Sequence, residues 1–218
     1  MTMLAAQMYT VRDFTQTSEG IDASLKKVRH IGYEAVQMSG WKRIDPQLLK
    51  DMADKHGLEI CATHVSFDEI VKGTRETIRQ HKIWGTKYIG LGSMPDMYRD
   101  TEEGFCQFVK DIRPAAEEIA NAGMHLIYHN HNFEFAKFDG RTGMDILLED
   151  TDPSWFRFEL DTYWITAGGG DPAEWIRKVA GRMDVVHFKD MVYSSSERRS
   201  VFAEVGEGNL NWPAIIGA

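Results

Sequence analysis

Imidazole and carboxylate side chains follow short apolar runs at four places in the sequence. These places are His64, the segment from His129 to Glu134, Asp161, and the segment from His187 to Asp190. Glu134, Asp161 and His187 together offer the oxygen and nitrogen ligands that bind divalent manganese, magnesium, cobalt or zinc. A single buried His or Asp is more often structural than a ligand. Three of them at the ends of successive runs favour a metal site.

The apolar runs have the length of buried strands. They recur about every 25 to 35 residues, and the segments between them have helical periodicity, which is typical of a parallel α/β sheet. The seven runs are Met3–Met8, Ala35–Met38, Leu58–Ala62, Tyr88–Leu91, Met124–Tyr128, Phe156–Leu160 and Val185–Phe188.

The segments between the runs carry recognisable helix ends. Helices are predicted over about residues 21–31, 46–56, 68–84 and 102–122, each followed by a glycine. Pro114 is expected to bend the fourth of these helices. The strongest start signal is Asp171-Pro172-Ala173-Glu174, in which the aspartate accepts from first-turn amides and proline fits the first helical position.

Two architectures fit this alternation, the doubly wound open sheet and the closed barrel. Neither Gly90-Leu91-Gly92 nor Gly168-Gly169-Gly170 matches a dinucleotide-binding loop, and both are interpreted as turns. Seven similar βα units favour the barrel, but eight units need about 250 residues. The sequence therefore predicts a (β/α)8 TIM barrel, in a single domain over residues 1–218, that is truncated after the start of the seventh helix so that strand eight is missing. A partner, such as a second copy of the chain, is the alternative cover for the exposed strand edges.

In a parallel barrel the active site forms where the strands end. Alternation places Arg157, Glu159 and Asp161 on one face of the sixth strand, and it points His187 and Lys189 into the barrel mouth. Asp161 and His187 are then expected to be neighbours on adjacent strands. Arg157 and Glu159 are expected to pair with each other inside the barrel.

Composition restricts the partners of the protein. The chain has 25 Lys and Arg against 33 Asp and Glu, a net charge of −8, which argues against nucleic-acid binding. No apolar stretch is long enough to cross a membrane, and no export signal is expected at the amino end. Cys61 and Cys106 are interpreted as buried thiols of a cytoplasmic protein.

Four segments resemble the sugar-phosphate isomerase and epimerase group of the xylose-isomerase-like TIM-barrel superfamily. They are Tyr128-His-Asn-His-Asn-Phe-Glu-Phe135, Leu160-Asp-Thr-Tyr-Trp164, Val186-His-Phe-Lys-Asp190 and Val205-Gly-Glu-Gly208, and Gln7-Met-Tyr-Thr-Val-Arg12 is similar to the group's first strand. The resemblance implies that Glu134, Asp161 and His187 are metal ligands, with Glu134 also acting as the catalytic base. The family adds a glutamate from strand eight, which has no counterpart in this sequence.

Further residues are candidates for substrate binding. Trp164 stands where the ketose epimerases carry a histidine, and it is expected either to form a floor for a sugar ring or to pack in the core. Lys189 resembles a lysine of inosose dehydratases and related lyases, and it could bind a phosphate or carboxylate or stabilise an enolate during catalysis. His64, His129 and His131 are candidates for contacts with sugar hydroxyls or for proton relay.

This set of residues suits reactions of sugars. A divalent ion that binds two vicinal oxygens of a keto-sugar or sugar phosphate favours loss of a carbon-bound proton and an enediolate, which is isomerase or epimerase chemistry. The same enediolate can expel a hydroxyl group, so an inosose-type dehydratase or lyase is an alternative. Two more distant alternatives are an apurinic-site endonuclease, which the negative charge disfavours, and a non-catalytic sugar-binding protein.

Overall fold

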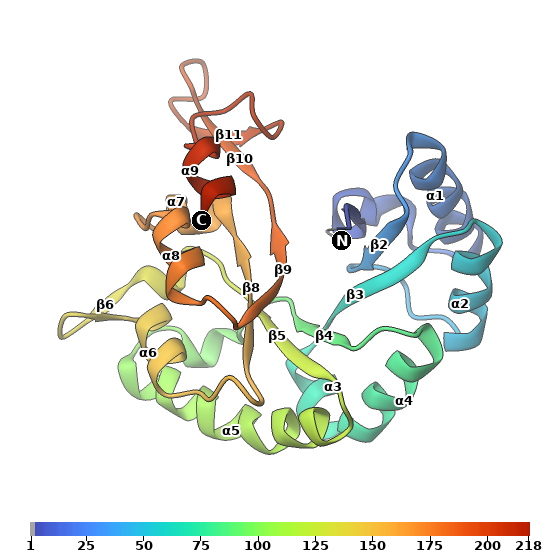
Figure 1. The fold of residues 1–218 in the computed structure, drawn as a ribbon, viewed down its shortest axis with the longest axis horizontal. Coiled ribbons are helices and arrows are strands. Elements are labelled where there is room, and N and C mark those ends of the chain that lie inside the picture. The colour runs from blue at the N-terminus through green and yellow to red at the C-terminus, as the bar shows by residue number, and fades with distance from the viewer. Residues whose placement is uncertain (1–2) are drawn as a thin grey trace. The chain divides into compact units, whose positions relative to one another are not determined.

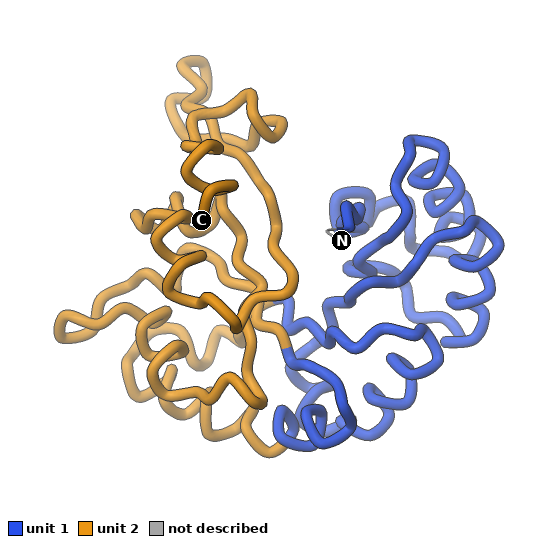
Figure 2. Tube along the Cα trace, viewed as in Figure 1, with its two compact units in different colours: residues 1–92, 115–126 blue, residues 93–114, 127–218 orange. Residues whose placement is uncertain are grey.

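The computed structural model describes residues 3–218, which divide into two compact units (Figure 2). Unit 1 comprises residues 1–92 and 115–126, and unit 2 comprises residues 93–114 and 127–218. The prediction of a single domain over residues 1–218 stays a prediction, and each unit is described by itself. Among the described residues, no helix is long and apolar enough to cross a membrane.

Unit 1 is built on parallel strands with helices on one face (Figure 1). The strands pair in the order β1-β2-β3-β4, and β5 begins beside β4, where His125 N donates to Lys87 O at 2.8 Å. The elements are β1 (Ala5–Gln7), η1 (Met8–Phe14), α1 (Ser18–Ile31), β2 (Ala35–Met38), α2 (Pro46–Lys55), β3 (Glu59–Val65), α3 (Phe67–Lys72), α4 (Thr74–Trp84) and β4 (Tyr88–Leu91). The carboxyl half of α5 (Glu102–Asn121) and the start of β5 (His125–His129) complete the unit.

The main sheet of unit 2 also consists of parallel strands. Its strands pair in the order β5-β8-β9, and two small antiparallel hairpins, β6-β7 and β10-β11, follow β5 and β9 in the chain. Besides the amino half of α5, its elements are η2 (Asp96–Tyr98), η3 (Phe133–Phe135), β6 (Lys137–Phe138), β7 (Arg141–Thr142), α6 (Gly143–Glu149), β8 (Arg157–Asp161), α7 (Thr162–Ala167), α8 (Pro172–Lys178), β9 (Met183–His187), β10 (Asp190–Ser194), β11 (Arg199–Ala203) and α9 (Trp212–Gly217). The seven parallel strands therefore correspond to the seven predicted apolar runs.

The residues at the helix ends form the capping hydrogen bonds that their types favour. Thr17 caps α1, which ends at Gly32 with φ +118, a left-handed conformation that glycine adopts at no steric cost. Asp45 accepts from Leu48 N at 3.0 Å at the start of α2, and Asp171 accepts from Glu174 N at 3.1 Å at the start of α8. The predicted ends at Gly32, Asp45 and Asp171 are confirmed, whereas α1 begins at Ser18, three residues before the predicted start.

The prediction of one helix over residues 68–84 is wrong, because the structure has two helices separated at Gly73. Carbonyls near the end of α3 accept from threonine hydroxyls instead of from amides of a continuing helix. Thr74 Oγ1 donates to Ile70 O at 2.6 Å, and Thr77 Oγ1 donates to Glu69 O at 2.9 Å. Side-chain hydrogen bonds of this kind compete with the helical ladder, and they end α3 here.

Two further sequence expectations concern single residues. Pro114 lies inside α5, which spans the predicted residues with a difference of one at its end. Cys61 and Cys106 are free thiols, as expected, but both are partly exposed and not buried. Cys61 lies on β3 and Cys106 on the first turns of α5, where one side of each element faces away from the core.

The core of unit 1 forms between the strands and the helices that cover them. Its buried side chains are Met8, Ile21, Leu25, Val28, Val36, Met38, Trp41, Leu49, Ala53, Leu58, Ile60 and Trp84. The core of unit 2 is rich in aromatic rings, and Tyr128 of β5 contacts Phe108 of α5 and Phe156, with ring centroids 5.8 and 5.7 Å apart. In both units this packing fixes the strands whose ends carry polar residues.

A histidine that sequence reasoning did not single out lies in the unit 1 core. His81 of α4 is fully buried, its Nδ1 is 2.7 Å from Thr77 O, and its Nε2 is 2.6 Å from Thr63 Oγ1. Since a carbonyl only accepts, Nδ1 carries the hydrogen, and the Thr63 hydroxyl donates to Nε2. Burial lowers the pKa of His81 to about 4, so the ring is neutral near neutral pH.

The buried His81 predicts a pH dependence of stability. Between pH 6.5 and about 4 the unfolded chain binds a proton at this residue that the folded protein does not, so the free energy of unfolding should decrease as the pH falls through this window. The full effect is on the order of 3 kcal/mol. Urea unfolding from pH 7 to 4 should show a flatter dependence for His81→Gln than for the wild-type protein. His30→Gln, a change at an exposed histidine, is the control, and equal slopes for His81→Gln and wild type would contradict the prediction.

Candidate metal centre

Three parallel strands of unit 2 end beside one another and carry the polar residues that the sequence singled out. In the register of β5 and β8, His129 is the partner of Glu159, and in that of β8 and β9, Asp161 is the partner of His187. The carboxyl ends of parallel strands meet at one edge of a sheet. The predicted neighbourhood of Asp161 and His187 is therefore confirmed.

The side chains at this edge converge on the Asp161 carboxylate. His129 Nε2 lies 3.3 Å and His187 Nδ1 lies 3.8 Å from Asp161 Oδ2. The two imidazole rings are adjacent, with centroids 4.6 Å apart. One ligand atom from each of the three residues lies within 4.8 Å of the others.

Asp161 is held in place by the backbone around it. The side chain is 1% exposed, its Oδ1 accepts from Trp164 N at 3.0 Å, and its own amide donates to Asn130 Oδ1 at 2.9 Å. Asp161 is thus the last residue of β8 and the amino-terminal cap of α7. Burial alone would raise its pKa, but His129, His187 and Lys189 hold that pKa well below its usual range. The carboxylate is therefore charged near neutral pH.

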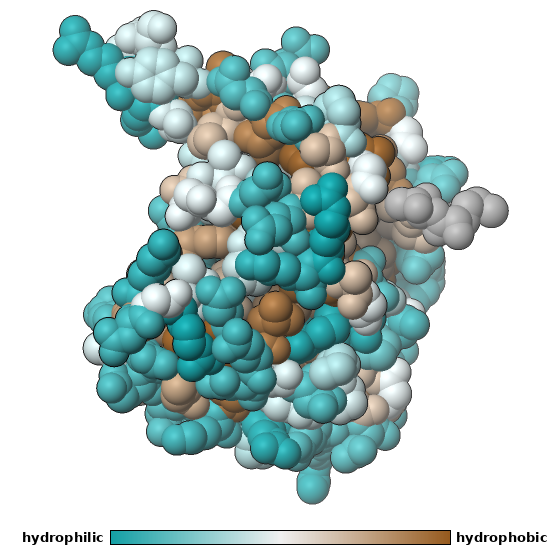
Figure 3. Space-filling view, turned by 60° about the vertical axis from the view of Figure 1, so that its left-hand side comes forward, coloured by the Kyte–Doolittle hydropathy of each residue, from teal (hydrophilic) through white to brown (hydrophobic). Residues whose placement is uncertain are grey.

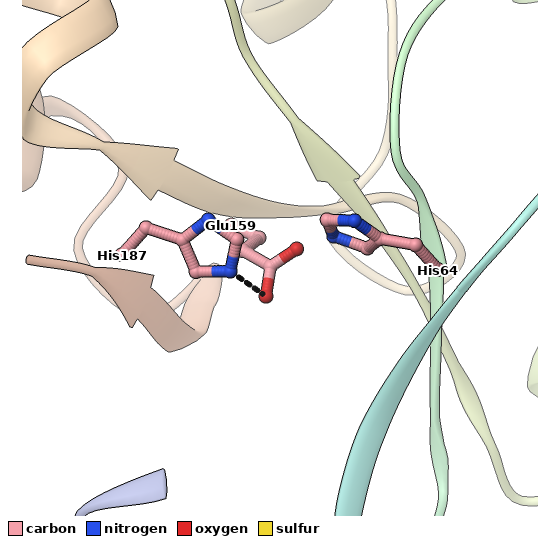
Figure 4. A group of neighbouring side chains, drawn as sticks. All are labelled: His64, Glu159 and His187. Carbon is pink, nitrogen blue, oxygen red and sulfur yellow. Dashed lines mark ion pairs between the residues drawn. The ribbon is translucent and has the colours of Figure 1, made fainter. Parts of the chain in front are cut away.

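His187 is held between two carboxylates. Its Nε2 lies 3.1 Å from Glu159 Oε1, and the two side chains face each other in Figure 4. Burial by itself would lower the pKa of His187, but the charges and hydrogen bonds of Glu159 and Asp161 raise it to about 9. The expected pairing of Arg157 with Glu159 is wrong, because Arg157 turns to Asp184 at 2.7 Å. Asp184 is the second residue of β9, beside the start of β8, where Arg157 lies.

Glu134 lies in η3, after β5, and is fully buried. Its Oε1 accepts from the Tyr128 hydroxyl at 2.6 Å, and its Oε2 accepts from His131 N at 2.8 Å. Burial raises the pKa of Glu134 to about 7, although these hydrogen bonds act in the opposite direction. Glu134 is not among the three residues whose ligand atoms converge, so its assignment as a ligand stays a prediction.

Lys189 and Trp164 lie beside Asp161. Lys189 Nζ is 3.6 Å from Asp161 Oδ2 and lies over three aromatic rings, with centroids 5.5 Å away for Tyr163, 5.0 Å for Trp164 and 4.4 Å for Phe202. An ammonium group over ring faces gains cation–π attraction, which keeps Lys189 at this edge of the site. Lys189 therefore lies between the Asp161 carboxylate and the aromatic rings, and its role and that of Trp164 in substrate binding stay predictions.

The remaining histidines differ in setting. The His131 ring lies 4.8 Å from that of His129 and 5.2 Å from that of Trp164, and its buried Nδ1 makes no hydrogen bond. Burial, aided by the proximity of His129, lowers the pKa of His131 to about 3, so the ring is neutral. His64 belongs to β3 in unit 1, where its Nδ1 lies 3.2 Å from Ser39 Oγ. A role of either residue in substrate binding stays a prediction.

The donor set fits a divalent ion. One carboxylate oxygen and two imidazole nitrogens are the mixture found in many sites for zinc, manganese and related metals. The neutral ring of His131 lies beside that of His129, and its buried Nδ1, which makes no hydrogen bond, is a further imidazole nitrogen. Asp161, His129 and His187 would hold the ion, and Glu134 is the predicted addition.

Some residues of this site were missed by sequence reasoning. Asn130, which binds the Asp161 amide, and Phe202, which covers Lys189, gave no signal because each contact joins residues far apart in the chain. The sequence did indicate Glu159, since alternation places it on the face of β8 that carries Asp161. It predicted Arg157 as the partner of Glu159, whereas the partner is His187.

The model of the xylose isomerase-like TIM barrel family matches residues 25–218. The inosose dehydratase of Geobacillus kaustophilus is 28% identical to this chain over an alignment of 230 residues, which covers 89% of this chain and 74% of that protein. A sugar phosphate isomerase/epimerase from Parabacteroides distasonis has a TM-score of 0.80 at 22% identity, covering 98% of this chain and 80% of that one. A xylose isomerase-like TIM barrel protein from Mycobacterium smegmatis, crystallised with magnesium, has a TM-score of 0.74 at 14% identity, covering 98% and 84%.

These matches define an α/β protein with the TIM-barrel type of fold. The chain belongs to the xylose isomerase-like TIM barrel family. The predicted superfamily and barrel class are thereby confirmed, and the inosose dehydratase shows that an enzyme is among its relatives.

A second buried carboxylate anchors the arm that follows β9. Asp190 accepts from the amides of Gly206, Gly208 and Leu210 at 2.9, 3.0 and 3.3 Å, and from Trp212 Nε1 at 2.5 Å. Residues 190–212, here called the arm, form a loop closed at its base by this side chain. Figure 3 shows hydrophobic residues exposed among hydrophilic ones in the upper part of that view. The exposed large hydrophobic side chains of the arm are Tyr193, Phe202 and Val205.

The anchor predicts the effect of a small substitution. A Cβ at position 208 would collide with the Asp190 carboxylate and with Met191 O, so Gly208→Ala should displace the Asp190 hydrogen bonds. Hydrogen bonds to a charged group contribute about 1.5 to 3 kcal/mol each, so exchange of the Gly206 and Leu210 amides should accelerate at least tenfold. Hydrogen exchange measured by NMR checks this. Gly217→Ala adds a methyl group where nothing lies within 4 Å and is the control, and unchanged exchange in Gly208→Ala would contradict the anchor.

Proposed function

We propose that this protein is a divalent-metal-dependent isomerase or epimerase of a keto-sugar or sugar phosphate. The observation that carries the proposal is the convergence of His129, Asp161 and His187 on one point at the carboxyl ends of three strands. The family's active sites belong at this end of the strands because the fold places its connecting loops there. The charged Asp161 and the aromatic and cationic groups beside it supply both a metal site and a place for a polar substrate.

In the proposed reaction, different residues of this chain have different roles. A bound divalent ion would polarise the carbonyl group of the substrate. Glu134 is the proposed base, because a carboxyl group with a pKa of about 7 can both take and return a carbon-bound proton at neutral pH. The Tyr128 hydroxyl and the His131 amide orient its two oxygens.

Lys189, Trp164 and the histidines are proposed to bind the substrate. Lys189 carries a positive charge 3.6 Å from Asp161, where it can stabilise negative charge that develops on a substrate oxygen. Trp164 offers a flat surface beside it, and His129 and His131 offer nitrogen atoms for hydroxyl groups. The ring of His131 is neutral, so it can accept a hydrogen bond from a sugar hydroxyl at Nδ1 or donate one there, depending on its tautomer.

Dehydration is the second candidate reaction. The similarity to an inosose dehydratase extends over 89% of this chain, and the placement of Lys189 next to Asp161 favours a reaction in which negative charge on oxygen is stabilised while a hydroxyl group leaves. Both candidates begin with the same proton transfer. They differ in whether water is lost afterwards.

Metal binding should depend on Asp161. Asp161→Asn removes the charged oxygen to which both imidazoles point, so the affinity for Mn²⁺ should fall by about 100-fold or more. Titration of the protein with Mn²⁺, with the free ion measured by electron paramagnetic resonance, checks this. Asp184→Asn, at the opposite end of β9, is the matched control and should bind as the wild type does. Equal affinity of Asp161→Asn and wild type would contradict the metal site.

Proton transfer should depend on Glu134. Keto-sugars, inososes and their phosphates, incubated in deuterium oxide with several divalent metals, should exchange one carbon-bound hydrogen when a substrate is among them. Glu134→Gln should reduce that exchange at least 100-fold, because the amide cannot act as a base. Glu103→Gln on the surface of α5 is the control, and retained exchange in Glu134→Gln would count against the assigned base. Mass spectrometry separates dehydration, which loses water, from epimerisation, which does not.

A further inference from the structure

Glu159 has no part in the proposed reaction, yet it is one of the most deeply buried charged groups in the protein. Its side chain is 0% exposed in the middle of β8. Burying a carboxylate is costly unless a partner of opposite charge or a hydrogen-bond donor faces it. The nearest arginine in the strand, Arg157, binds Asp184 and Gly181 O instead. What faces Glu159 in unit 2 is the imidazole of His187, at 3.1 Å (Figure 4).

The strand geometry explains why these two side chains meet. Glu159 lies two residues before Asp161 on the same face of β8, and Asp161 is in register with His187 of β9. The register shifts at Phe158 and Glu159, which places Glu159 opposite Val185. His187 is therefore flanked by two carboxylates of the neighbouring strand, one at its end and one deeper in the sheet.

The two ring nitrogens of His187 face different carboxylates. Nε2 faces Glu159 at 3.1 Å, and Nδ1 faces Asp161 at 3.8 Å. An ionised carboxylate only accepts hydrogen bonds. Because Glu159 Oε1 lies close to Nε2 of His187, Nε2 must carry the hydrogen of this hydrogen bond. When the ring is neutral, its lone pair is then on Nδ1, the nitrogen that faces Asp161.

We propose that Glu159 is a positioning residue that holds His187 in the Nε2–H tautomer, with Nδ1 directed toward Asp161 as the ligand atom for a divalent cation. This inference rests on the proposed function for the cation, but the tautomer itself can be measured without one. A hydrogen bond from a ligating histidine to a buried carboxylate fixes the ring orientation and raises the basicity of the ligating nitrogen. The role of Glu159 is thus to prepare the ligand, and it does not touch the substrate.

Two substitutions at this position separate the parts of the interaction. Glu159→Gln keeps the length of the side chain and an oxygen that accepts from Nε2, but it removes the charge. Glu159→Met keeps a similar volume and removes the acceptor altogether. Glu174→Gln, at an exposed position of α8 where the carboxylate pairs with Lys178, is the matched control.

The tautomer is tested first, in the metal-free protein. Long-range proton–nitrogen NMR spectra of protein labelled with ¹⁵N-histidine, recorded at a pH at which the ¹⁵N shifts show a neutral ring, should show the hydrogen of His187 on Nε2 in wild type, Glu159→Gln and Glu174→Gln. In Glu159→Met the hydrogen should shift partly or wholly to Nδ1. A wild-type ring with its hydrogen on Nδ1, or an unchanged tautomer in Glu159→Met, would overturn the proposal even if the protein binds metal well.

Cation binding is tested second, with Mn²⁺ as the probe. The affinity should fall about 10- to 100-fold in Glu159→Met and by a smaller factor in Glu159→Gln, which is the range seen when partners of metal-ligating histidines are removed. If Glu159→Met does not fold, as judged by circular dichroism, Glu159→Gln decides, and an unchanged affinity overturns the proposal. If the wild type binds no Mn²⁺ while the tautomers behave as expected, the metal-dependent function fails and the positioning role of Glu159 stands.

Discussion

The carboxylate of Asp161 is the group on which the arrangement of unit 2 depends. It ends β8, caps α7, and accepts from or faces groups on β5, β9 and the segment after β9. A charged group that is 1% exposed is costly unless donors and cations surround it, so the convergence of the strand ends offsets the cost of burying Asp161. The same convergence creates the candidate metal centre, and stability and chemistry therefore require the same contacts.

Acidic and basic side chains face each other around this centre. Asp161 is charged and faces His187 and Lys189, and Glu159 also faces His187, whose pKa is raised to about 9. If Nδ1 of His187 is a ligand atom, as proposed, a divalent ion and a proton would compete for that position.

The arm extends this centre by aromatic contacts. Asp190 closes the base of the arm with backbone amides, and Phe202 of β11 then lies against Tyr163 with ring centroids 4.4 Å apart and against Lys189. One carboxylate thus fixes the loop while a second, Asp161, fixes the strand ends. Lys189, the residue before Asp190, contacts both Asp161 and Phe202 of the arm.

Local residue patterns determined the strands, most helix ends and the likeness to a barrel family, because periodicity and capping act over a few neighbouring residues. They also placed Asp161 and His187 side by side, since alternation and parallel register are regular. The tertiary structure decided what the pattern leaves open. Arg157 turned to Asp184 and left Glu159 to His187, the Glu134 carboxylate was bound by Tyr128, and hydroxyls of Thr74 and Thr77 divided a predicted helix. Each of these depends on which of several polar partners lies within hydrogen-bond distance after packing, and that distance is not contained in the order of the residues.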